Sequence, residues 1–113
     1  MVAHKKYSKL FSSYKIRHLE LKNRIVKTSQ WFIYPEPDGS IGDRVVRFYE
    51  SIAKGGVGMI VIEETVFDWM RGCSNIPHLR LDEDRFIPGW QRLADVIHSY
   101  GTKCVVQITH AGP

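Results

Sequence analysis

The sequence lacks the long apolar segments of membrane proteins. None of its runs approaches the roughly 18 apolar residues that a bilayer span requires, and the stretch from Met1 to Lys6 has no signal-peptide core. With 43% hydrophobic and 25% charged residues, the composition also disagrees with a disordered or fibrous chain. We therefore expect a globular cytoplasmic protein that does not bind membranes.

Patterns typical of metal and nucleic-acid binding are missing too. Cys73 and Cys104 form no Cys-x-x-Cys pair, and the five histidines show no His-x-x-x-His spacing. The net charge of +4 comes from basic residues spread along the chain, with Lys5 and Lys6 as a short pair. The sequence predicts reduced thiols, no metal site and no nucleic-acid partner.

Apolar periodicity predicts an alternation of short strands and amphipathic helices. A hairpin is expected at about residues 14–21, and strands are expected at about 24–28, 59–65 and 103–109. One helix begins at an Asp43 N-cap and stops at Gly55 and Gly56, and a second begins near Pro88 and stops at Gly101. This order predicts a βαβαβ unit with parallel strands and right-handed crossovers.

Two α/β architectures use this unit, the doubly wound sheet and the (β/α)8 TIM barrel. The first strand is not followed by the G-x-G-x-x-G loop of many doubly wound sheets, and the Gly55–Gly58 cluster follows a helix instead. The barrel is therefore favoured. Since a barrel takes about 250 residues, residues 1–113 would form its N-terminal portion, the hairpin plus the first βαβαβ segment. We expect this portion to be unstable alone, because its sheet edge is unpaired.

Polar residues follow each predicted parallel strand, at the end where barrels carry their active sites. The clusters are Thr28–Trp31, Glu63–Thr65, and Gln107 with Thr109 and His110. Each cluster alone has a simpler explanation, since polar residues also mark where strands emerge into loops. The three together suit a planar heterocycle with polar edges.

Five stretches resemble the Old Yellow Enzyme family of flavin oxidoreductases. They are LELKNRIV (19–26), DGSIGDRVVRFYE (38–50), AKGGVGMIVIEE (53–64), LRLDEDRFIPGWQRLADVIHSYG (79–101) and QITHAG (107–112). Within the family, the chain is most similar to the branch of 2,4-dienoyl-CoA reductases. The resemblance implies an FMN-dependent ene-reductase, in which hydride passes from NADH or NADPH through the flavin to an activated C=C bond. The implied substrate is an unsaturated carbonyl compound or an unsaturated or aromatic acyl-CoA.

The resemblance also implies cofactor contacts. It places the flavin against Thr28, Ser29, Gln30, Trp31, Glu64 and Gln107, with the Gln107 amide at the pyrimidine edge. His110, in the HAG motif, and Tyr34, in the loop above the first strand, are the catalytic candidates, although a loop tyrosine also suits surface packing. The substrate-anchoring pair, the proton donor and the phosphate loop belong to later strands, in the same or another chain. The implied assembly is a homo-oligomer, and a 4Fe–4S cluster and FAD are implied only for regions beyond residue 113.

Two departures from the family pattern bear on the flavin. Ser29, Gln30 and Trp31 replace a Pro-Met pair and a following Cys or Thr, so the Trp31 indole N–H is offered to the flavin carbonyl instead. Glu64 replaces a small residue, and an ionised carboxylate there would lower the flavin potential by Coulomb repulsion, unless it points away and pairs with Arg or Lys. These changes leave two alternatives open, a non-catalytic structural or interaction subunit derived from the same barrel and a small stand-alone binding domain.

Overall fold

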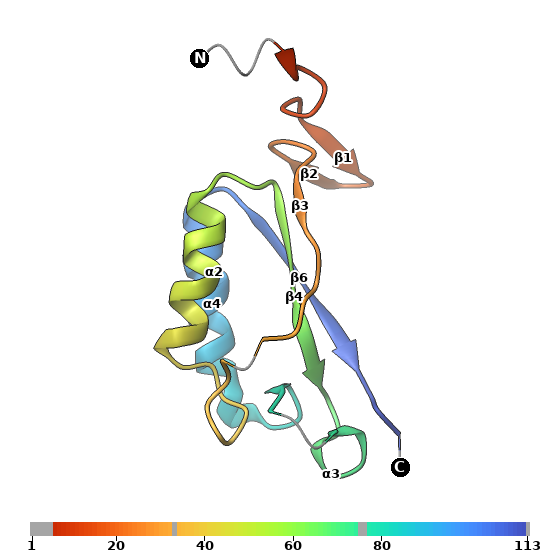
Figure 1. Cartoon of the computed structure of the whole chain (residues 1–113), viewed down its shortest axis with the longest axis vertical. Coiled ribbons are helices and arrows are strands. Elements are labelled where there is room, and N and C mark those ends of the chain that lie inside the picture. The colour runs from red at the N-terminus through yellow and green to blue at the C-terminus, as the bar shows by residue number, and fades with distance from the viewer. Residues whose placement is uncertain (1–5, 33, 75–76, 113) are drawn as a thin grey trace.

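The computed structural model describes residues 6–32, 34–74 and 77–112. A hairpin of β1 (Tyr14–Ile16) and β2 (Leu19–Leu21) precedes the strands β3 (Val26–Lys27), β4 (Met59–Val66), β5 (Leu79–Arg80) and β6 (Lys103–Thr109). The helices are α2 (Asp43–Lys54), α3 (Trp69–Gly72) and α4 (Ile87–Ser99), with a 3-10 turn η1 (Asp84–Phe86) before α4. The hairpin lies at one end of the molecule, and α3 lies at the other (Figure 1).

Strand β4 is the centre of a parallel sheet. It pairs with β3 through Met59 and Ile60, with β5 through Thr65 and Val66, and with β6 along its length. Because β6 occupies one edge of β4, β3 and β5 share the other edge. The predicted βαβαβ unit with parallel strands is thus confirmed.

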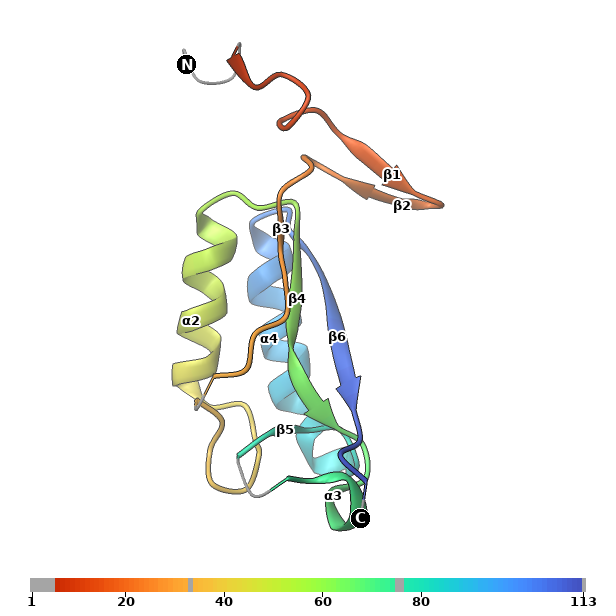
Figure 2. The ribbon, with the colours of Figure 1, turned by 45° about the vertical axis from the view of Figure 1, so that its right-hand side comes forward.

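The helices α2 and α4 lie side by side on one face of this sheet (Figure 2). Between sheet and helices lies the core, which is formed by Val45, Tyr49, Ala53, Ile60, Ile62, Leu79, Leu93 and Ile97. On β6, Cys104 and Val106 pack against this core, so the alternation of a strand places Val105 and Gln107 on the opposite face. Val105 is 40% exposed. That second face is apolar and uncovered, whereas parallel sheets are ordinarily buried on both faces.

Several predicted boundaries differ from those of the structure. The strand expected at 24–28 is only Val26–Lys27, and the strand expected at 59–65 extends to Val66. The Asp43 N-cap is wrong, because Gly42 is the N-cap and no side chain caps the helix. Asp43 is the first helical residue, and its carboxylate pairs instead with Arg92 of α4 at 2.6 Å. This ion pair joins the two helices, which explains why the carboxylate is not turned back onto its own helix end.

The predicted helix ends agree better with the structure. Gly55 is the C-cap of α2, and Gly56 adopts a left-handed conformation with φ +93°, which glycine accepts without strain. Pro88 lies in the first turn of α4, and Gly101, with φ +66°, follows its C-cap Tyr100. No helix in the described ranges is long and apolar enough to cross a membrane.

Candidate functional site

The three predicted polar clusters lie at the same end of the sheet. Val66, the last residue of β4, pairs with Thr109 at the end of β6, so the segments after these strands begin side by side. The backbone N–H of Ala111 donates to the carbonyl of Gly72 in α3, which brings the segment after β6 against the segment after β4. The segment after β3 joins them through a hydrogen bond between Phe32 and Glu63. The parallel arrangement therefore brings the clusters together, as the sequence predicted.

A β-bulge separates the two adjacent glutamates of β4. The strand advances three residues, from Ile62 to Thr65, while β6 advances two, from Val106 to Ile108. The extra residue redirects the chain at Glu63 and Glu64, as bulges near functional sites often do. Glu63 is fully buried, whereas Glu64 is partly exposed.

Glu63 binds the loop that follows β3. Its Oε2 atom accepts a 3.0 Å hydrogen bond from the backbone N–H of Phe32, and its own N–H donates to the hydroxyl of Tyr49 at 2.9 Å. The Tyr49 hydroxyl also donates to Oε1 over 3.4 Å. Burial raises the pKa of Glu63, while the Phe32 N–H and the charge of Lys27 act in the opposite direction. Sequence reasoning placed Glu63 in a polar cluster but missed this role, since no local pattern predicts the bulge.

Lys27 ends β3 beside the same carboxylate. Its Nζ atom is buried and has no hydrogen-bond partner within the described part of the chain. It lies 5.0 Å from the ring centre of Phe32 and 5.5 Å from that of Tyr49. Burial lowers the pKa of Lys27, and the charge of Glu63 opposes that change. Lys27 is a second residue that sequence reasoning did not select.

The segment Thr28–Trp31 connects Lys27 with Phe32, the residue that binds Glu63. Thr28 and Gln30 are exposed, and the Ser29 hydroxyl is buried without a partner among the residues described. The Trp31 indole N–H donates to the carbonyl of Pro77 at 3.0 Å. We expected this N–H to bind a flavin carbonyl, but in the structure it binds a backbone carbonyl instead.

The polar side chains of Glu64 and Gln107 are both accessible to solvent at this end of the sheet. Gln107 is exposed, on the face opposite the helices. No ion pair joins Glu64 to a lysine or arginine in the ranges that the structure covers. The alternative in which a basic side chain neutralises Glu64 therefore has no support here.

His110 packs tightly against α3. A Cβ atom on Gly72 would lie 2.6 Å from Cδ2 of the His110 ring, so the ring would have to shift to admit a larger residue. Nδ1 of His110 accepts the backbone N–H of Gly112 at 3.1 Å, and Nε2 lies 4.0 Å from the Asp68 carboxylate. These contacts make His110 a residue that joins two loops at the carboxyl edge.

Tyr34, the other catalytic candidate, belongs to an aromatic cluster over α2. Its ring stacks on Phe32 at 5.7 Å and meets Phe48 edge-on at 5.3 Å. The Arg44 guanidinium lies 4.5 Å from the centre of its ring. The structure thus favours the packing alternative for Tyr34.

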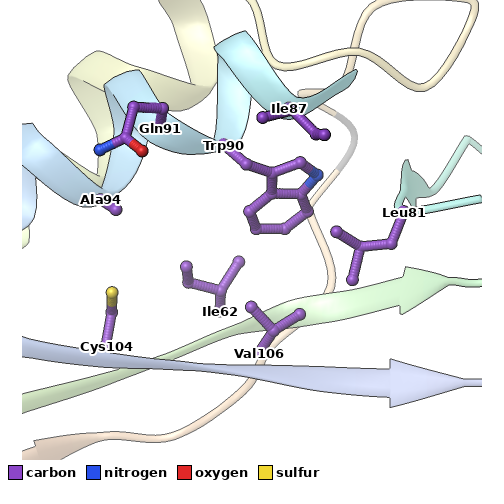
Figure 3. A pocket seen from close by; sticks show the side chains of 8 residues that line it. All are labelled: Ile62, Leu81, Ile87, Trp90, Gln91, Ala94, Cys104 and Val106. Carbon is purple, nitrogen blue, oxygen red and sulfur yellow. The ribbon is translucent and has the colours of Figure 1, made fainter. Parts of the chain in front are cut away.

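An apolar groove of about 320 Å³ lies elsewhere, on the helix-facing side of the sheet. Trp90 and Ala94 of α4 face Cys104 and Val106 of β6 across it (Figure 3). Because the groove is on the outer side of the strands, it is separate from the polar residues at their carboxyl ends. No group of His, Cys, Asp or Glu suited to a metal ion occurs in the described residues.

The residues present at the carboxyl edge fit a flavin. Among the described residues the buried Ser29 hydroxyl has no partner, and the exposed Gln107 amide can donate and accept hydrogen bonds at one edge of a planar ring. Val105 lies two residues before Gln107 on β6 and on the same face of the sheet, so apolar surface adjoins the amide.

A hairpin followed by a parallel βαβαβ unit, with polar residues at the carboxyl ends of its strands, is the first segment of a flavin-oxidoreductase (β/α)8 barrel. The model of the NADH:flavin oxidoreductase / NADH oxidase family matches residues 9–113. The chain belongs to this family, which confirms the resemblance to the Old Yellow Enzymes.

Individual relatives support the same assignment. The chain is 39% identical over 106 residues to an NADH oxidase of Thermoanaerobacter brockii, covering 94% of this chain and 16% of that protein. A 2-naphthoyl-CoA reductase solved in complex with 2-naphthoyl-CoA is 27% identical, with a TM-score of 0.88 over 95% of this chain and 17% of that chain. The Old Yellow Enzyme of Pichia sp. AKU4542 has the same fold, with a TM-score of 0.83 at 22% identity over 92% of this chain and 28% of that chain. The chain spans 15% to 31% of the length of the curated relatives that it matches.

Proposed function

We propose that this chain is the flavin-contacting N-terminal segment of an FMN-dependent enzyme that reduces an activated C=C bond with NADH or NADPH. The observation that carries the proposal is that the segments after the parallel strands hold free polar groups at one end of the sheet, a buried Ser29 hydroxyl with no partner among the described residues and an exposed Gln107 amide. Membership of an NADH:flavin oxidoreductase family supports the flavin and the nicotinamide donor.

The proposed acceptor is an unsaturated or aromatic acyl-CoA. Support comes from the TM-score of 0.88 to a reductase whose structure holds 2-naphthoyl-CoA. An ionised Glu64 beside the flavin would stabilise the oxidised ring over the anionic reduced ring, and a low potential suits an acceptor that is hard to reduce. Other activated C=C compounds, such as unsaturated carbonyls, are the second class to test.

In this proposal, bound flavin supplies hydride transfer from the nicotinamide to the acceptor. The chain's own residues bind and orient the ring. Gln107 presents a donor and an acceptor together, which matches the alternating N–H and C=O groups of a pyrimidine edge. Ser29 gains a hydrogen-bond partner, which it lacks among the residues described. Glu63, through the Phe32 N–H, holds the segment in which Ser29 lies.

We further propose that a barrel domain beginning with residues 1–113 is completed by further strands, from the same or another chain. The uncovered apolar face, where Val105 is 40% exposed, supports this, because parallel sheets are covered on both faces. The proton donor, the groups that orient the substrate and the phosphate-binding loop would come from those strands. Assembly as a homo-oligomer in the cytoplasm is part of the same proposal.

The test uses the complete barrel that contains this segment. We expect the purified protein to be yellow, to release FMN on denaturation, and to oxidise NADH or NADPH when an aromatic or unsaturated acyl-CoA is added. Gln107→Leu should weaken flavin binding by about 5- to 150-fold, the equivalent of about 1–3 kcal/mol for a lost buried partner. Gln91→Leu on the exposed side of α4 is the matched control and should leave flavin affinity unchanged.

Two outcomes would count against this function. A colourless, folded protein that does not bind added FMN would favour the alternative of a non-catalytic structural subunit derived from the same barrel. Flavin binding that is equally tight in the parent and in Gln107→Leu would remove Gln107 from the site.

A further inference from the structure

The segment Thr28–Trp31 is bracketed by Lys27, whose charge interacts with the buried Glu63 carboxylate, and Phe32, which hydrogen-bonds it. Lys27 precedes the segment, and its Nζ atom lies over the rings of Phe32 and Tyr49 at 5.0 and 5.5 Å. Phe32 follows the segment, and its N–H donates to Glu63 Oε2 at 3.0 Å. Both ends of the segment are therefore tied to the surroundings of Glu63.

We propose that Lys27 and Glu63 form a buried charge pair that holds Thr28–Trp31 in the backbone conformation that receives the flavin. The inference rests on the proposed function, because it takes this segment to be the one that lies along the flavin. Lys27 and Glu63 act as positioning residues, since neither is placed against the cofactor itself.

The surroundings of Lys27 explain why the two charges depend on each other. The ammonium group is buried, has no hydrogen-bond partner among the residues described, and is stabilised by the faces of two aromatic rings. The Glu63 carboxylate, fully buried, is the opposite charge that acts on it. At low effective dielectric, unit charges attract strongly through space even without direct contact. Each charge thus offsets the desolvation cost of the other.

Tyr49 fixes the position of the carboxylate. Its hydroxyl accepts the Glu63 backbone N–H at 2.9 Å and donates to Oε1 at 3.4 Å. Tyr49 belongs to the core face of α2 and is fully buried. The helix therefore holds the bulged part of β4, and β4 in turn holds the loop after β3.

A charge pair predicts a specific pattern of coupling that simple packing does not. Removing one charge leaves the other buried without a counter-charge, which is costly. Removing both leaves two neutral side chains of similar size. The double variant should therefore be less disturbed than either single variant, so the effects are strongly non-additive.

The experiment measures flavin binding in the complete barrel for Lys27→Met, Glu63→Gln and the double variant, by fluorescence titration with FMN. Gln at position 63 still accepts the Phe32 N–H, so the charge alone is removed. We expect about tenfold weaker binding in each single variant and binding within about threefold of the parent in the double variant. Lys27→Arg, which keeps the charge, should bind nearly as the parent does.

A matched control comes from the pair Glu50 and Tyr100, another carboxylate that accepts a tyrosine hydroxyl, at 3.0 Å. Glu50→Gln should not change flavin affinity. Additive losses, or single variants that bind like the parent, would overturn the charge pair. Near-ultraviolet circular dichroism confirms that each variant is folded before titration.

Hydrogen exchange of the Phe32 amide separates this inference from the proposed function. The charge pair predicts a protected amide in the parent and in the double variant, and at least about tenfold faster exchange in each single variant. If the parent binds no flavin, the proposed function fails, and the exchange rates still decide whether the charges hold the segment. Equal exchange in all four proteins would contradict the pair even if flavin binds.

Discussion

Arg80 is the residue whose replacement should destabilise the carboxyl edge most clearly. Its side chain is 10% exposed, and its guanidinium forms two hydrogen bonds with Asp82, at 2.9 and 2.7 Å, and a third with Glu83. The group also lies over the rings of Trp69 and Phe86, at 4.7 and 4.8 Å. Its backbone N–H donates to the Gly39 carbonyl, so β5 and the loop before α2 are joined here.

Arg80→Met keeps much of the packing volume but leaves the Asp82 carboxylate, 15% exposed, without its counter-charge. Breaking a buried pair by removing one partner costs about 3–5 kcal/mol. The lower end applies because Glu83 is half-exposed and is screened by water. A loss of about 3 kcal/mol lowers the melting temperature of a domain of barrel size by roughly 6–12 °C.

The assay is denaturant unfolding of the complete barrel, followed by tryptophan fluorescence. Trp69 and Trp90 report directly, since the first stacks on the guanidinium and the second donates its indole N–H to the Arg80 carbonyl at 2.8 Å. Arg85→Met is the control, because Arg85 is 49% exposed and water screens its ion pairs, which therefore add little stability. A loss for Arg80→Met no greater than that of Arg85→Met would refute the reasoning.

Three further predictions concern the same edge. Gly72→Ala places a Cβ atom 2.6 Å from the His110 ring and should cost about 1–3 kcal/mol, measured by denaturant unfolding, and an unchanged stability would contradict the contact. The hydrogen bond from Arg80 holds the pKa of Asp82 below 3.8, so the pair stabilises the fold above about pH 4 and loses this effect as pH falls through the folded pKa. Asp82→Asn should therefore lose less stability than the parent between about pH 5 and pH 2 in acid titrations, and parallel curves would exclude the linkage. Glu64→Ala should raise the flavin midpoint potential by tens of millivolts, since about 1.4 kcal/mol of lost repulsion corresponds to about 30 mV for a two-electron couple, and no rise would eliminate Glu64 as a tuning residue.

Periodicity and turn residues predicted most of the fold, because those signals are local. The apolar face of α2, the Gly55–Gly56 helix end and the run of β4 each follow from neighbouring residues. The short elements α3 and β5 escaped prediction, since β5 depends on pairing with the far end of β4. Asp43 was mistaken for an N-cap because its partner, Arg92, is distant in sequence.

In the candidate site, too, local patterns could be predicted from the sequence, whereas contacts between distant residues could not. The order of strands placed Gln107 and the Thr28–Trp31 segment at one edge, because parallel strands all end on the same side. The partner of the Trp31 indole, the Pro77 carbonyl, lies 46 positions away in the chain and has no sequence signal. Tyr34 was likewise a candidate until its packing against Phe32 and Phe48 was known.

The sequence by itself determined the family, the barrel class and the end of the sheet at which its polar clusters gather. Each of these follows from patterns among residues that are close together in the sequence. Only the tertiary structure decided that Glu63, rather than its neighbour Glu64, is buried at a bulge, and that Tyr49 and the Phe32 N–H bind it. The physical reason is that burial and Coulomb interactions depend on which distant segments pack together, and a bulge of one residue exchanges the surroundings of two identical side chains.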